Sequence, residues 1–267
     1  MTTTRRNGIV LLIGLGLAGA GAAQALTDAE FKCQAKVSKA ATKFIAAKGT
    51  CARRCVGEAA RALHPWADCA PPFAGAMAEC VAGPTGAEAK FEAAIMNACD
   101  PSTRAGTDCP ECYDGGDCGI GGEASDRMQN VEGQLDAVGA GIYCNVANGT
   151  AAERTCETNT AKALAKLTGA IGKCYDKCHA SARRGIVVAS TCAPPASDAT
   201  TAACVSVADQ KTIARIDRKC ADVGALPDCA ATDDYPTGSA WVNLVDLAVS
   251  GNVPGTYCQS PSGAFVE

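Results

Sequence analysis

One short stretch of the chain has a spacing that suggests redox chemistry. In CYDKCHA, Cys174 and Cys178 lie four positions apart, and His179 follows directly. Covalent haem attachment needs two thiols for thioether bonds and an adjacent histidine to ligate the iron, usually as C-x-x-C-H. One alternative for this stretch is therefore a c-type haem site made of these three residues, which would make the protein a single-haem redox carrier.

The same cysteine spacing occurs a second time without a histidine. Cys51 and Cys55 are also four positions apart, and Val56 follows them. Two cysteines at i and i+4 of a helix lie about 6 Å apart with nearly parallel Cβ vectors, which is a poor geometry for bonding one another. We therefore favour disulfides from each cysteine to a different partner, with His179 as a solvent-facing helical residue and no cofactor.

The spacing of the cysteines repeats along the chain. From Cys33 to Cys51 is 18 positions, as from Cys156 to Cys174, and both halves then continue with Cys-x3-Cys and reach Cys-Ala-Pro-Pro 14 positions later. Such identity predicts a tandem repeat of eight cysteines, with units at residues 26–150 and 151–267. The two remaining cysteines, Cys112 and Cys118, lie in an insertion of the first unit and are expected to close a local ring.

All 18 cysteines are expected to form disulfides, although the sequence leaves their pairing open. They are Cys33, Cys51, Cys55, Cys69, Cys80, Cys99, Cys109, Cys112, Cys118, Cys144, Cys156, Cys174, Cys178, Cys192, Cys204, Cys220, Cys229 and Cys258. Aromatic residues make up only 4% of the chain, so the crosslinks are expected to stabilise a protein whose apolar side chains are mostly small.

The N-terminus has the features of an export signal. Arg5 and Arg6 precede an uncharged apolar run, and Ala23-Gln24-Ala25 has the small-x-small pattern of a cleavage site. Residues 1–25 are thus predicted to be a signal peptide, and the mature chain is expected to be secreted or periplasmic and not membrane-spanning. Disulfides persist in such compartments, and the alanine- and glycine-rich composition hints at a bacterial source. The net charge of −4 gives no general attraction to nucleic acid.

Apolar residues follow a helical period, which predicts an all-α fold of two tandem disulfide-rich helical bundles. The first helix begins near Asp28, a candidate N-cap, and Cys33, Val37 and Phe44 share one of its faces. Gly49 and its counterpart Gly172 allow either a close helix–helix approach or a kink. Further helices are expected at residues 74–81, 86–97, 125–138 and 209–219.

An acidic, glycine-rich insertion at residues 108–126 offers a possible cation site. Asp114, Asp117 and Glu123 are the calcium ligands of this weaker alternative, but their spacing does not match an EF-hand loop, and a solvated loop is favoured. The Cys-Pro-Glu-Cys stretch within the insertion has zinc-knuckle spacing without the second pair that a zinc site needs, so disulfides are favoured there as well.

Lysines form one-sided rows on the two long predicted helices. Such rows suit either a solvated surface, which we favour, or the binding of an anionic envelope polymer. The rows are Lys32, Lys36, Lys39 and Lys43, and Lys162, Lys166, Lys173 and Lys177.

No catalytic motif is present, and the two histidines do not correspond between the halves. The sequence therefore favours a non-enzymatic binding or structural role for an exported protein. It leaves the partner open, with an anionic envelope polymer and another exported protein as the two candidates.

Overall fold

The chain is all-helical in the computed structural model, which describes residues 26–70, 73–99, 109–113, 117–119, 122–144, 147–221, 223 and 237–258. No strand occurs in these ranges. The elements are α1 (Asp28–Ala59), η1 (Trp66–Cys69), α2 (Gly75–Ala82), α3 (Ala87–Cys99), α4 (Glu123–Ile142), α5 (Ala151–Arg183), η4 (Ala189–Cys192), α6 (Ala199–Cys220) and α7 (Gly238–Thr256). The predicted all-α class and the predicted disulfide bonding are both confirmed.

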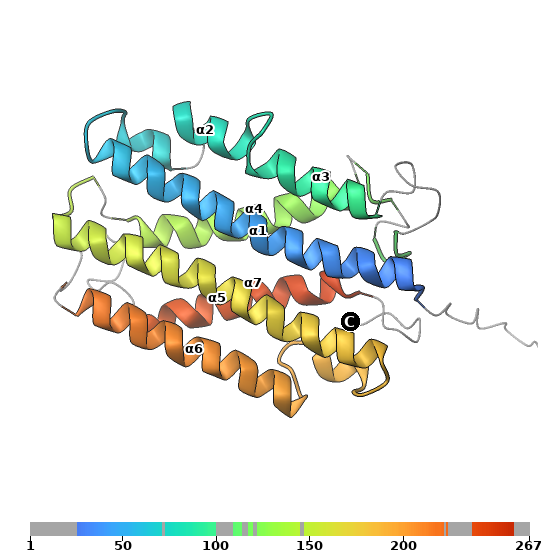
Figure 1. Ribbon diagram of the computed structural model, residues 1–267. Coiled ribbons are helices and arrows are strands. Elements are labelled where there is room, and N and C mark those ends of the chain that lie inside the picture. Colours follow the sequence, from blue (N-terminus) through green and yellow to red (C-terminus); the bar gives the residue numbers. More distant parts are fainter. Residues whose placement is uncertain are drawn as a thin grey trace, which may run out of the picture.

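The two longest helices, α1 and α5, lie side by side through the middle of the molecule and run antiparallel (Figure 1). α3 packs against α1, and α6 packs against α5, so the long helices lie between the shorter ones. α4 and α7 lie behind them in this view, and each contacts both α1 and α5. None of the helices in the described part of the chain combines the length and apolar character needed to cross a bilayer.

The two long helices begin with the same capping arrangement. Thr27 accepts a hydrogen bond from the backbone of Glu30, whose carboxylate accepts one from the backbone of Thr27 in return. Thr150 and Glu153 form the equivalent pair at the start of α5. The prediction of Asp28 as the cap was wrong by one residue, because a threonine with a glutamate three positions later satisfies two backbone N–H groups together.

Small residues let α1 and α5 approach closely. A Cβ atom built on Gly172 would lie 3.2 Å from Thr42 Oγ1, and one built on Gly169 would lie 3.2 Å from Thr42 Cγ2. At the other end of the contact, a Cβ on Gly49 would lie 3.9 Å from the Cβ of Ala165. Of the two alternatives left open by the sequence, Gly172 therefore serves close approach, together with Gly169, whereas a Cβ atom on Gly49 would make only an ordinary van der Waals contact.

Six disulfides join the two long helices to the elements that follow them, three from α1 and three from α5. The first cysteine of each long helix bonds to a cysteine at the end of a later helix. The two cysteines of its Cys-x3-Cys pair bond to two different partners. In the first half the bonds are Cys33–Cys99, Cys51–Cys80 and Cys55–Cys69. In the second half they are Cys156–Cys220, Cys174–Cys204 and Cys178–Cys192.

The cysteines of the insertion pair differently from the prediction. Cys118 bonds to Cys109, nine residues away, whereas Cys112 bonds to Cys258 across a sequence separation of 146. The expected local ring between Cys112 and Cys118 was wrong, because the C-terminal end of α7 lies beside the insertion, where Tyr113 donates a hydrogen bond to the carbonyl of Thr256. Cys144 is also disulfide-bonded, and Cys229 lies outside the described residues.

Two main groups of buried side chains form the interior. One lies in the first half around α1, α3 and the start of α4, where Phe44 packs against Phe91 with ring centroids 5.3 Å apart. The other surrounds Trp241 between α5, α6 and α7 and also receives the end of α4. The space between these two groups is where the candidate site lies.

Candidate ligand cavity

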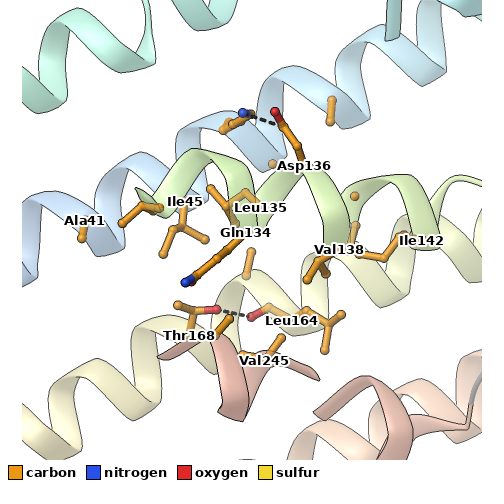
Figure 2. A pocket seen from close by; sticks show the side chains of 18 of the residues that line it. Ala41, Ile45, Gln134, Leu135, Asp136, Val138, Ile142, Leu164, Thr168 and Val245 are labelled. Atoms are coloured by element: carbon orange, nitrogen blue, oxygen red, sulfur yellow. Dashed lines mark hydrogen bonds and ion pairs between the residues drawn. The ribbon is translucent and has the colours of Figure 1, made fainter. Parts of the chain in front are cut away.

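A cavity of about 310 Å³ lies at the junction of α1, α4, α5 and α7. Figure 2 shows Leu135 and Val138 of α4 opposite Leu164 of α5 and Val245 of α7. Ile45 of α1 closes another side. Both halves of the chain therefore contribute to the wall, and most of what they present is carbon.

Several polar groups of the wall are already bonded within the protein. Thr168 Oγ1 donates to the carbonyl oxygen of Leu164 at 3.0 Å. Asn252 Nδ2 donates to the side-chain oxygen of Gln134 and to the carbonyl of Ala248. Because these groups have partners, they do not require polar atoms from an occupant, and the cavity suits an apolar molecule.

A buried cation lies in the wall near α4. Lys48 Nζ is 2.6 Å from both Glu132 Oε1 and Asp136 Oδ1, and 5.0 Å from the centre of the Phe73 ring. Burial raises the pKa of the Asp136 carboxyl in spite of this ammonium group. Burial and repulsion from Glu132 also raise the pKa of the neighbouring Glu88 to about 7. Lys48 is thus paired with two carboxylates, and the neighbouring Glu88 binds a proton near neutral pH.

A second polar cluster joins α1, α5 and the end of α7. Asp176 Oδ1 accepts hydrogen bonds from Ser38 Oγ at 2.5 Å and from Tyr257 Oη at 2.6 Å. The His179 ring stacks on that of Tyr257 with centroids 3.9 Å apart and an angle of 9° between the rings. Ser38 and Tyr257 also line the cavity, so this cluster forms a second polar border in addition to the one around Lys48.

His179 is buried, whereas the sequence predicted a side chain that faces solvent. Its side chain is only 3% exposed, and burial lowers its pKa to about 4. The expectation was wrong because the C-terminal residues of α7 cover this face of α5, and a helical period alone does not reveal that contact. Cys174 and Cys178 are bonded to Cys204 and Cys192, so the haem alternative has no free thiols in this structure.

The predicted metal ligands are only partly described. Asp114 and the side chain of Glu123 lie outside the described residues, and Asp117 accepts a hydrogen bond from the backbone of Gly119 at 2.8 Å. The calcium alternative stays a prediction. The cysteines of the Cys-Pro-Glu-Cys stretch belong to two separate disulfides, Cys109–Cys118 and Cys112–Cys258, which leaves no thiolate pair for zinc.

All eight lysines of the two predicted rows have exposed side chains. Lys162 and Lys166, however, border a concavity that Lys173 and Lys177 do not reach. The second row is therefore divided into two parts with different surroundings.

The cavity could not be predicted from the sequence. The sequence features that accompany the cavity are the scarcity of aromatic residues and the presence of small residues on helix faces that become buried, such as Ala41, Gly49 and Gly139. Small residues on a helix face are also typical of tight packing, and only the crossing of four helices decides which of them border open space.

No family model, curated protein or solved structure matches this chain. Its function is therefore inferred from its own geometry.

Proposed function

We propose that this protein is an exported, non-enzymatic binding protein that holds a largely apolar small molecule in the cavity between its two halves. The observation that carries the proposal is the cavity of about 310 Å³ with walls from α1, α4, α5 and α7. This volume lies within the range of small-molecule sites, about 300–1,000 Å³.

Energetics support a binding role. Most of the wall is apolar, and an apolar ligand that packs against it would remove carbon surface from water, which contributes about 25 cal/mol per Å² of buried apolar area.

The tandem organisation is part of the same proposal. We interpret residues 26–150 and 151–267 as two copies of one eight-cysteine helical unit. An offset of 123 positions relates the capping pair Thr27 and Glu30 to Thr150 and Glu153, and it also relates Gly49 to Gly172. The three equivalent disulfides of each half follow nearly the same offset. On this interpretation the ligand site arises where the two copies meet.

Export is supported by the predicted signal at residues 1–25 and by the abundance of disulfides. A non-enzymatic role is proposed because the sequence contains no recognisable catalytic motif. A bacterial source and a partner in the cell envelope stay predictions.

A cavity-filling variant tests the binding site. Gly139 lines the cavity on α4, and a Cβ atom built on it would meet nothing within 4 Å. Gly139→Leu would add four carbon atoms to the space, and at about 0.8 kcal/mol per methylene it would remove roughly 3 kcal/mol of ligand burial. We expect the uncharged fluorophore N-phenyl-1-naphthylamine to bind the unmodified protein saturably and to bind the variant at least tenfold more weakly.

The same helix provides the matched control. Gly133 is exposed, a Cβ atom there would also meet nothing within 4 Å, and the residue does not line the cavity. Gly133→Leu has the same gain in helix propensity and should bind the fluorophore as the unmodified protein does. Absence of saturable binding, or equal loss in both variants, would contradict the proposal.

A further inference from the structure

A second concavity, of about 340 Å³, lies on the other side of the α1–α5 contact and is lined by cations. Arg53 comes from α1, Lys162 and Lys166 come from α5, and Arg215 comes from α6. The other lining residues are alanines and Thr50, so none of the residues that line it is acidic. We call these four cationic residues and the concavity between them the basic groove.

The four cations are not neutralised by ion pairs within the described part of the chain. Arg53 Nη2 donates to Thr50 Oγ1 at 2.7 Å, while Arg53 Nη1 and Arg215 Nε are buried without a hydrogen-bond partner. Glu157, whose charge acts on Tyr143 together with that of Arg53, is fully buried. Even with Glu157 counted, the groove keeps a positive excess on a chain whose net charge is −4.

Covalent bonds hold the groove in shape. Cys156–Cys220 and Cys174–Cys204 join α5 to α6, and Lys162 and Arg215 lie between these two bonds along their helices. α1 packs closely against α5 where Thr42 lies over Gly169 and Gly172. Keeping four positive side chains together costs electrostatic energy, and a rigid scaffold that maintains them without paired acids is typical of an anion site.

We propose that the basic groove binds a multivalent phosphate anion. Guanidinium groups present planar pairs of N–H donors that match phosphate oxygens, and the two ammonium groups add charge without a fixed geometry. A single orthophosphate would leave much of the volume and charge unused, whereas an anion of two or three linked phosphates reaches cations on all three helices. None of the four cations lines the apolar cavity, and Ala165 is the one residue that borders both sites, so this proposal does not depend on the proposed function.

Titration calorimetry with tripolyphosphate at low ionic strength tests the proposal. We expect one site per chain, with an affinity at least tenfold higher than that for orthophosphate and a steep decrease on addition of salt. The double variant Lys162→Gln/Arg215→Gln should bind tripolyphosphate at least tenfold more weakly, while its circular dichroism stays unchanged.

The matched control is Lys173→Gln/Lys177→Gln, which removes the same charge from exposed positions outside the groove. Its affinity for tripolyphosphate should stay within about twofold of the unmodified protein. Absence of binding to the unmodified protein would overturn the proposal. Equal weakening of the two double variants would also overturn it, because binding would then reflect only the general charge of α5.

Discussion

His179 shows how a single buried side chain makes the fold sensitive to acid. In the folded state burial lowers its pKa to about 4, whereas in the unfolded chain its pKa is that of a free histidine, about 6.5. The unfolded state therefore binds the proton first as the pH falls. The contribution of the neutral ring to stability is fully present above pH 6.5 and is lost progressively down to about pH 4.

The variant His179→Phe isolates this effect, because phenylalanine keeps a flat ring over Tyr257 but has no proton to bind. We expect the unmodified protein to lose up to about 3 kcal/mol more unfolding free energy than the variant between pH 7 and pH 4. Denaturant titrations at several pH values measure the difference, and carboxylates that titrate in both proteins cancel. Parallel pH profiles for the two proteins would show that the ring is already charged or exposed in the folded state.

At the scale of elements, the contact between α1 and α5 depends on the missing side chain of Gly172. A Cβ at this position would lie 3.2 Å from Thr42 Oγ1, which is closer than nine in ten contacts of real Cβ atoms. Gly172→Val is therefore expected to push the helices apart and to destabilise the protein by about 1–3 kcal/mol. The combination with Thr42→Ala should recover part of this loss, because the alanine gives up the hydroxyl and methyl groups that clash.

Thermal unfolding of the single and double variants measures the coupling between the two positions. Gly133→Val on α4 is the control, since a Cβ atom there meets nothing within 4 Å and only the propensity of the helix changes. If Gly172→Val were no more destabilising than the control, the helices would not be in close contact at this point.

The helices themselves could largely be predicted from the sequence. The expected segments at residues 74–81 and 86–97 lie within one or two positions of α2 (Gly75–Ala82) and α3 (Ala87–Cys99). The expected segment at 209–219, by contrast, covers only the second half of α6 (Ala199–Cys220). Glycine and proline between apolar segments mark these boundaries locally. The period of α1 likewise reveals that Cys33 and Phe44 share a buried face.

What packs against each face could not be predicted, because periodicity identifies a buried side but not its partner. His179 lies on a face that α7 covers from about 80 residues later in the chain, and Cys112 meets Cys258 across the whole second half. The cavity has the same origin, since each of its walls is an ordinary apolar helix face and only their crossing leaves space. Long-range contacts of this kind carry no local signal in one sequence.

At the scale of the whole molecule, the bond Cys112–Cys258 joins the first half to the C-terminal end of the second. The corresponding loop of 146 residues is the longest among the disulfides of the described residues. Chain-entropy estimates for loops of this length give about 5 kcal/mol, against roughly 2.7 kcal/mol for a loop of about ten residues. The long-range bond should therefore stabilise the folded chain more than the local one.

The double variants Cys112→Ala/Cys258→Ala and Cys109→Ala/Cys118→Ala compare the two bonds directly, because each removes one disulfide from the same insertion. Guanidinium titration should show a loss of unfolding free energy that is larger for the first variant by about 2 kcal/mol. Loss of Cys112–Cys258 also frees the end of α7 that lines the cavity, so binding of N-phenyl-1-naphthylamine should weaken in the first variant and stay unchanged in the second. If the local bond proved the more stabilising, or if the fluorophore bound both variants equally, the halves would be held together by helix packing alone.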